Sequence, residues 1–352
     1  MSITIAGKKV GAIGFGLMGK YSDADDFRLV TRIISMTLHF TGLTWRATPT
    51  PYDDAVKVMK AALDRGANFW NAAQFYGPPT ANSLQLLNHY FTKYPDDSKK
   101  VVVSMKGCFG ATGPDCSPEG IKKSIDNCLE ILDGKAFIDV FAPARIDPNV
   151  PVENTMQTLA GYVKDGKIGG IGLSECNADT IRRAHAVHPL SSVEVEMSLF
   201  STDPLSNGIT KACAELNIPL VAYSPLSRGW LTGQIHKLDD IPANDSRRNF
   251  PRFQPDVFDL NLELVKEIEK LAKAKGYTMP QIAIGWVQAQ GKQPGNPAII
   301  PIPGATTIPR VEENLTPVAL SAQDLEEISQ LLSKISVHGD RYGGVYKRFM
   351  NL

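Results

Sequence analysis

No stretch of this sequence is apolar for long enough to cross a bilayer as a helix. An excess of charge of either sign is also missing, because 37 Lys and Arg residues balance 37 Asp and Glu residues. Such a chain is a poor match for nucleic acid or for an anionic membrane surface. The N-terminal MSITIAGKKV lacks the apolar core of a secretion signal, and the C-terminus carries no lipidation or retention signal. We therefore expect a cytoplasmic protein with no nucleic-acid or membrane partner.

Cysteine is scarce and unpaired in the sequence. The five cysteines are Cys108, Cys116, Cys128, Cys176 and Cys213, and no two of them form a CxxC pair. An odd number without such pairs favours reduced thiols in a structural role. No Cys/His cluster has the spacing of zinc ligands, so we predict no metal site.

Short apolar runs, typical of buried parallel strands, alternate with amphipathic stretches along nearly the whole chain. The expected strands cover residues 10–15, 67–70, 101–105, 138–141, 170–173, 193–197, 220–223 and 298–302, and the expected helices include 52–64, 118–132, 153–164, 179–186 and 209–216. Ser117 followed by Pro118 is a typical helix start. This alternation predicts a parallel sheet covered by helices.

An open doubly wound sheet and a closed barrel both satisfy this pattern. The alternation continues through the 352 residues without a linker or a change of composition. This continuity favours a single (β/α)8 (TIM) barrel, one domain over residues 1–352. Residues 228–256, rich in Pro, Asp, Asn and Arg, follow the seventh expected strand and are predicted to form a functional or mobile loop.

The stretch Gly14-Phe15-Gly16-Leu17-Met18-Gly19 matches the GxGxxG pattern of dinucleotide-binding Rossmann folds. That motif needs a helix directly after it, and then a second strand that ends in an acidic residue. Neither follows here. We therefore interpret the glycines as a tight loop at the end of the first barrel strand, where the backbone approaches a ligand closely.

Six motifs in chain order resemble those of the aldo-keto reductase family. They cover residues 68–77, 101–106, 138–148, 170–174, 221–229 and 300–314. The resemblance extends over essentially the whole chain except residues 20–42. It implies a (β/α)8 barrel that reduces an aldehyde or ketone with a nicotinamide cofactor.

By this resemblance, Tyr76 is the proton donor and Lys106 lies beside it. Carbonyl reduction needs a hydride at carbon and a proton at oxygen. Tyrosine is a weak acid at neutral pH, and a neighbouring ammonium favours its phenolate form. We therefore expect Lys106 to lower the pKa of Tyr76 and make it a usable acid. Both residues follow expected strands, at the end of the barrel where active sites lie.

The resemblance also implies a set of cofactor-binding residues. Ser174 and Glu194 fall where the family holds the nicotinamide amide, and Tyr223 would stack on the nicotinamide ring. The remaining candidates are Ser224, Leu226, Gly229 and Leu231 at the pyrophosphate, Arg310 at the adenosine 2′-phosphate, and Glu313 and Asn314 at the adenine. Gly304 stands where the family often has lysine. NADP(H) is the expected cofactor, and NAD is not excluded.

Two positions depart from the family's Asp-Tyr-Lys-His set. Asn71 stands at the aspartate position and Ala144 at the histidine position. Asn71 can still accept a hydrogen bond from Lys106 but adds no charge, and Ala144 can donate nothing to a carbonyl oxygen. Arg145 is adjacent, yet a regular strand would turn its side chain to the opposite face.

Residues 43–51 and 141–145 resemble the fungal pyridoxal reductase branch of the family. Trp45, Ala144 and Arg145 are accordingly the candidate substrate residues, and pyridoxal is the expected substrate. Pyridoxal carries a phenol beside its aldehyde, which would polarise the carbonyl from within. Two alternatives stay open: a carbonyl or keto-acid reductase of specialised metabolism, and a catalytically weakened barrel that binds NADP.

Residues 20–42 interrupt the resemblance. Without them the chain reads GFGLMGLTWRATPTP, an unbroken match to the family. Gly19-Lys20-Tyr21 and Phe40-Thr41-Gly42 can be encoded by codons that contain an intron donor and an intron acceptor. We hypothesise that this atypical insertion is a translated intron; the alternative is a true loop insertion with a short helix. The oligomeric state is not predicted.

Overall fold

Eight parallel strands follow one another around a closed sheet. In a computed structural model, neighbouring strands are hydrogen-bonded in the order β3, β4, β5, β8, β9, β10, β11, β12. The first and last strands close the ring, because Gly14 N donates to Pro301 O (2.9 Å) and Gly16 N donates to Pro303 O (3.1 Å). The expected (β/α)8 barrel is therefore confirmed, and the Rossmann alternative is wrong.

The structure describes residues 3–18, 50–78, 80–110, 112–316 and 318–352. The barrel strands are β3 (Phe15–Gly16), β4 (Phe69–Ala73), β5 (Val102–Gly107), β8 (Val140–Pro143), β9 (Ile171–Ser174), β10 (Leu190–Glu196), β11 (Leu220–Tyr223) and β12 (Ile299–Pro301). Trp45 and the 20–42 insertion, to which the intron hypothesis applies, lie outside the described residues. No helix within the described ranges is long and apolar enough to cross a membrane.

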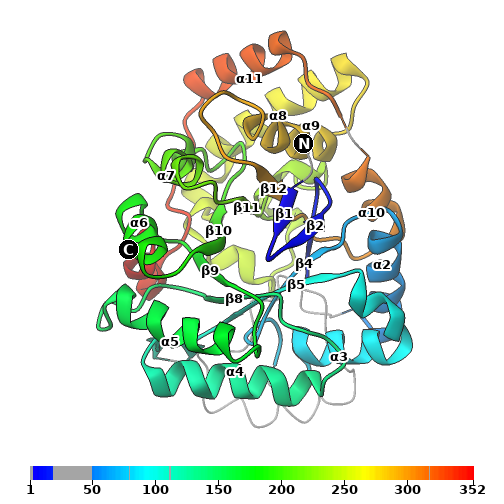
Figure 1. The fold of residues 1–352 in the computed structure, drawn as a ribbon. Helices are drawn as coiled ribbons and strands as arrows, with labels where there is room; N and C mark the ends of the chain where they lie inside the picture. Colours follow the sequence, from blue (N-terminus) through cyan, green and yellow to red (C-terminus); the bar gives the residue numbers. More distant parts are fainter. Residues whose placement is uncertain (1–2, 19–49, 79, 111, 317) are drawn as a thin grey trace.

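Helices surround the strands on the outside of the barrel (Figure 1). They are α2 (Tyr52–Asp64), α3 (Ser83–Lys93), α4 (Pro118–Leu132), α5 (Val152–Lys164), α6 (Ala178–Val187), α7 (Ile209–Glu215), α8 (Pro255–Lys275), α9 (Met279–Gln290), α10 (Ile308–Leu315) and α11 (Ala322–Lys334). The predicted start of α4 is confirmed, because the Ser117 hydroxyl accepts from Gly120 N ahead of Pro118. All five cysteines are buried and free.

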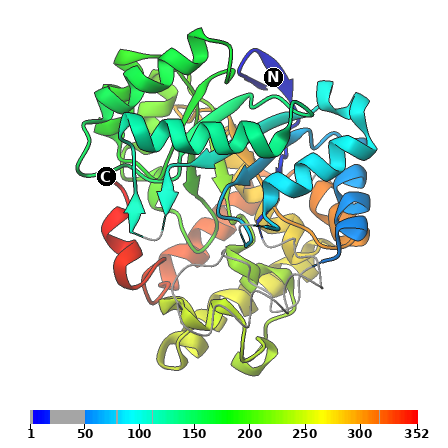
Figure 2. The same ribbon diagram turned by 90° about the horizontal axis from the view of Figure 1, so that it is seen from below.

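The first expected strand was wrong in its bounds. Residues 10–15 merge the end of an N-terminal hairpin, β1 (Ile3–Ile5) with β2 (Lys8–Val10), and the barrel strand β3. The chain bends between them at Ala12 and Ile13, just after Gly11, where a Cβ would lie 2.2 Å from Gly66 O. Ile5 and Val10 pack against the inner barrel core, and Figure 2 shows the hairpin at the barrel end opposite residues 228–256.

Gly14 and Gly16 are needed where the barrel closes. A Cβ on Gly14 would lie 2.8 Å from Phe69 O, and one on Gly16 would lie 2.8 Å from Ile302 O. The close approach predicted for this glycine stretch is therefore made to neighbouring barrel segments, because the first and last strands meet there.

Residues 228–256 form a series of short 3-10 segments: η3 (Ser227–Thr232), η4 (Leu238–Asp240), η5 (Ser246–Asn249) and η6 (Pro251–Phe253). Trp230 anchors them to the barrel. Its ring stacks on Phe253 (centroids 4.9 Å apart) and lies against Phe258 of α8 (4.6 Å). The predicted long loop therefore carries its own apolar core.

Candidate active site

Tyr76 lies in the turn that follows β4, and Ser83 holds this turn. Ser83 Oγ donates to Ala73 O (2.7 Å), and Ser83 N donates to Tyr76 O (2.9 Å). The Tyr76 side chain is buried and lines a groove at the carboxyl end of the barrel. The turn that carries the predicted proton donor is thus fixed at both its start and its end.

Lys106 is the residue of β5 that pairs with Ala73 of β4. Its Nζ donates to Asn71 Oδ1 (2.5 Å) and lies 2.9 Å from the Oε1 of Glu194. It also lies 5.2 Å from the centre of the Tyr76 ring. Tyr76, Lys106 and Asn71, predicted together as catalytic residues, are therefore brought together.

Glu194 supplies the carboxylate that Asn71 lacks. Both oxygens of Glu194 lie within 3.0 Å of Lys106 Nζ, and Oε2 also accepts from Asn71 Nδ2 (2.7 Å). Glu194 was predicted at the nicotinamide amide, because it stands at that family position. The prediction missed its pairing with Lys106, since Glu194 lies on β10, far from Lys106 in the sequence.

The pKa of Tyr76 is raised well above 10.0, first by burial and then by the negative charge of Glu194. The pKa of Tyr76 is thus not lowered as expected, because burial and the charge of Glu194 both raise it. The nearby Arg145 acts in the opposite direction and lowers the pKa of Tyr76. Burial lowers the pKa of Lys106 itself, and Glu194 counters this only in part. Tyr76 is thus a protonated phenol throughout the neutral range.

Ala144 and Arg145 lie just beyond β8, beside Lys106. Ala144 is buried, and its N donates to Gly107 O (2.9 Å). The guanidinium carbon of Arg145 lies 5.6 Å from the centre of the Tyr342 ring, and its charge acts on both Tyr76 and Lys106. The expectation that Arg145 points to the opposite face was wrong, because β8 ends at Pro143 and the chain leaves the regular strand.

A half-open groove with a cavity volume of about 230 Å³ lies beside Tyr76. It extends from Asn71 and Tyr76 along the ends of β11 and β12. Of the predicted cofactor residues, Tyr223, Ser224, Leu226, Gly229, Gly304 and Arg310 line it. Arg310 donates to Gln234 across the groove.

The other predicted cofactor residues do not line this groove: Ser174, Glu194, Leu231, Glu313 and Asn314. The Leu231 side chain is buried in the apolar core beside Trp230. Glu313 is half-buried on α10, and the Asn314 side chain donates to Gly304 O (3.3 Å). Leu231 stands at a motif position, but η3 turns its side chain inward.

Two features in and next to the groove suit a nicotinamide dinucleotide. The Ser174 hydroxyl, at the end of β9, is buried and has no hydrogen-bond partner among the described residues. Ser224, Ser227 and Arg228 have positive φ angles of 51°, 53° and 58°, followed by Gly229 at 106°. Such strained loops cluster at ligand sites. A free hydroxyl at the nicotinamide position and a strained loop at the pyrophosphate position are both suited to that group.

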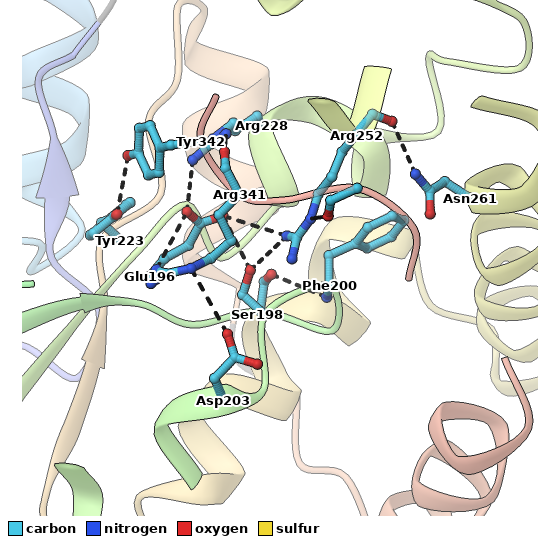
Figure 3. Close-up of polar contacts among 12 residues, drawn as sticks. Glu196, Ser198, Phe200, Asp203, Tyr223, Arg228, Arg252, Asn261, Arg341 and Tyr342 are labelled. Carbon is cyan, nitrogen blue, oxygen red and sulfur yellow. Dashed lines mark hydrogen bonds and ion pairs between the residues drawn. The ribbon is translucent and has the colours of Figure 1, made fainter. Parts of the chain in front are cut away.

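A network of buried charges, missed from the sequence, connects this loop to the C-terminal segment (Figure 3). Arg228 donates to Glu196 Oε2 (2.7 Å) and to Arg341 O. Arg341 in turn makes a bidentate pair with Glu175 (3.1 and 3.0 Å). The Tyr342 hydroxyl lies 3.1 Å from that of Tyr223. No sequence motif indicated this network, since its side-chain contacts join residues that lie 32 to 166 positions apart.

Comparisons with known proteins all point to one family. A model of the aldo/keto reductase family matches residues 37–333. A Schizosaccharomyces pombe protein named "Probable pyridoxal reductase 2" is 42% identical over 348 residues, 96% of this chain and 96% of its own length. The aldo-keto reductase yakc of the same yeast, whose name carries the qualifier NADP(+), is 35% identical over 99% of this chain and 96% of its length.

Among solved structures, a glycerol dehydrogenase from Gluconobacter oxydans superposes with a TM-score of 0.77 at 22% identity. It covers 96% of this chain and 97% of its own, and at this identity it supports the fold alone. The chain belongs to the aldo/keto reductase family. It is an oxidoreductase of a family in which carbonyl reduction with a nicotinamide cofactor is typical.

Proposed function

We propose that this protein reduces pyridoxal to pyridoxine with NADPH. The observation that carries the proposal is the buried cluster of Tyr76, Lys106, Asn71 and Glu194 beside the groove. Tyr76 donates a proton to the carbonyl oxygen, and the bound nicotinamide supplies the hydride. Tyr76 carries its proton at neutral pH, as a proton donor must, although its raised pKa makes it a weaker acid than an ordinary tyrosine.

The side chains of the groove would hold the cofactor. Ser174 is a free donor for the nicotinamide amide, Tyr223 offers its ring, and the backbone from Ser224 to Gly229 would receive the pyrophosphate. Arg310 is the cation for a 2′-phosphate, because a guanidinium matches phosphate in a bidentate way. This arginine supports NADPH over NADH.

The substrate is supported by the relative named as a pyridoxal reductase, which shares 42% of its residues with this chain. A cytoplasmic location is part of the proposal, and microscopy of a fluorescently tagged chain tests it. Residues 1–352 are proposed to act as one catalytic domain.

The test uses the purified full chain and follows NADPH absorbance. We expect faster turnover, as kcat/KM, with pyridoxal than with 4-nitrobenzaldehyde. Tyr76→Phe should lower kcat by about 100-fold or more while cofactor binding is kept. Tyr277→Phe, at an exposed position, is the matched control.

Each alternative has its own signature. Clear preference for 4-nitrobenzaldehyde or a keto acid would replace pyridoxal by another carbonyl substrate. Cofactor binding without turnover of any carbonyl, and with no effect of Tyr76→Phe, would identify a weakened NADP-binding barrel instead.

A further inference from the structure

Arginine outnumbers buried carboxylate at the mouth of the barrel. Arg228, Arg252 and Arg341 lie around Glu196 and Glu175, with the nearest contacts at 2.7, 4.0 and 3.0 Å. Both carboxylates are almost fully buried. These two negative charges are therefore already matched by three positive ones.

Arg145 is a fourth cation beside this network and has no carboxylate of its own. Among the described residues, the Arg145 side chain donates one hydrogen bond, to the backbone oxygen of Ala144. No ion pair within 4.0 Å joins it to an acidic residue in the part of the chain that the structure describes. The charge of Arg145 lowers the pKa of Glu175, but both oxygens of Glu175 accept hydrogen bonds from Arg341. The more distant charge of Glu175 helps to keep Arg145 ionised, but no carboxylate among the described residues contacts the guanidinium, so its donors are open to a ligand oxygen.

Arg145 does not line the groove, but it lies close enough for its charge to act on both Tyr76 and Lys106. Ala144 N is hydrogen-bonded to Gly107 O, one residue beyond Lys106. On the other side, the Arg145 guanidinium faces the ring of Tyr342, whose hydroxyl lies 3.1 Å from that of Tyr223 in the groove. Arg145 thus contacts Tyr342 on the side of the groove, and it directly follows Ala144, the family's histidine position.

We propose that the Arg145 guanidinium binds an ionised oxygen next to the substrate's carbonyl, so that the enzyme selects aromatic aldehydes with an ortho hydroxyl group. The inference rests on the proposed function and deepens it. A guanidinium presents parallel N–H donors, which can contact the phenolate oxygen and the neighbouring carbonyl oxygen together. The phenolate is unchanged by the reaction. Carbon gains the hydride of the cofactor, and the carbonyl oxygen gains the proton of Tyr76.

This arrangement explains how the chain can work with alanine at the histidine position. A positive charge beside the carbonyl oxygen stabilises the negative charge that develops there during reduction. An arginine does not titrate near neutral pH and cannot donate its proton as a histidine does. Arg145 therefore polarises and orients the substrate, while Tyr76 remains the acid.

The test compares pyridoxal with its 3-methyl ether, which lacks the ionisable oxygen. In the wild type we expect kcat/KM to be at least tenfold higher for pyridoxal. Arg145→Gln should reduce that ratio at least tenfold by slowing pyridoxal alone, and Arg145→Lys should give an intermediate ratio. Arg182→Gln, at an exposed arginine paired with Glu215, is the matched control and should leave the ratio unchanged.

A second measurement does not need turnover. Calorimetry of pyridoxine and its 3-methyl ether with the NADP-loaded protein should show that Arg145→Gln weakens pyridoxine at least tenfold and the ether little. An unchanged ratio in both experiments, or an equal loss for phenol and ether, would overturn the role of Arg145. If the wild type reduces neither aldehyde, the proposed function fails, and the binding data still decide whether Arg145 recognises the phenolate. Cofactor affinity and thermal unfolding of Arg145→Gln, compared with the wild type, exclude misfolding as the cause.

Discussion

The carboxylate of Glu194 on β10 lies 2.9 Å from the ammonium of Lys106 on β5. The family's aspartate position is Asn71, so the negative charge next to the active-site lysine comes from the other side of the barrel. Asn71 donates a hydrogen bond to Glu194, and both side chains accept hydrogen bonds from Lys106. Moving the carboxylate from position 194 back to position 71 by mutation tests this arrangement.

Glu194→Gln removes the only carboxylate within 4.0 Å of Lys106 among the described residues. We expect kcat/KM for pyridoxal to fall about tenfold or more, because a buried lysine without a counter-ion loses its charge. Asn71→Asp in the same chain should restore part of the loss by returning the carboxylate on β4. A double variant no better than Glu194→Gln would show that Glu194 acts other than as the partner of Lys106.

The pH dependence of reduction has a defined sign. The reaction uses the protonated form of Tyr76, and the pKa of Tyr76 is raised above 10.0 by burial and by Glu194. We expect the wild-type kcat/KM to be level through neutral pH, without a fall caused by Tyr76 below pH 10.0. In Glu194→Gln the pKa of both Tyr76 and Lys106 should fall, since Glu194 raises both, so the alkaline loss should move to lower pH. A shift to higher pH would contradict this assignment.

Gly229 in the cofactor loop has φ of 106°, and a Cβ there would lie 2.6 Å from an Arg247 Nη1. Gly229→Ala should therefore raise the Kd for NADPH about tenfold, from backbone strain plus displacement of Arg247. Gly233→Ala is the matched control, because Gly233 also has positive φ (71°) but its Cβ would meet nothing within 4 Å. Equal affinities of the two variants, measured by fluorescence titration, would argue against a role for the Gly229 contact.

Arg310 lines the groove and donates to Gln234. Arg310→Met should raise the KM for NADPH about tenfold or more and leave that for NADH nearly unchanged, because only NADPH carries the 2′-phosphate. Arg182→Met serves as a control for loss of a surface charge. Similar changes for both cofactors would place Arg310 away from the phosphate.

The Arg341–Glu175 pair fastens the C-terminal segment to the end of β9. Burial alone would raise the pKa of Glu175, but the charges of Arg341 and Arg145, with hydrogen bonds from Arg341 and from Glu196 N, hold it below its ordinary 4.5. The folded-state pKa is thus lower than the unfolded one. The pair therefore stabilises the fold above pH 4.5, and this contribution is lost as the pH falls through the folded-state value.

We expect Arg341→Met to lower the free energy of unfolding by about 3 kcal/mol at pH 7, because Glu175 is left buried and unpaired. Urea unfolding at pH 7 and at pH 4 checks this, and the difference between variant and wild type should shrink at the lower pH. A difference that is constant with pH would mean that packing, and not the ion pair, is lost.

Much of the fold was predicted from local patterns. Helices α2 and α4 have the predicted bounds, and the Ser117 start follows from its own side chain. The first strand failed because residues 10–15 form one apolar run although β2 and β3 belong to different sheets. Periodicity cannot locate such a break, since it depends on the approach of Gly11 to Gly66, a long-range contact.

The candidate site divides in the same way. Tyr76, Lys106 and Asn71 could be predicted because each stands in a short motif next to a strand end, and parallel strands bring such ends together. Glu196, Arg341 and Tyr342 carry no motif. Their role depends on which charges the folded chain brings within 4 Å, and sequence order does not contain that information.

The sequence by itself determined the barrel, the family and the pair Tyr76–Lys106, because alternation and motif order are local properties. Only the tertiary structure decided that Glu194 pairs with Lys106, that burial and Glu194 raise the pKa of Tyr76, and that the charge of Arg145 acts on Tyr76 and Lys106. The physical reason is that charge balance and pKa depend on distance and burial, which are set when strands from separate parts of the chain meet at one end of the barrel.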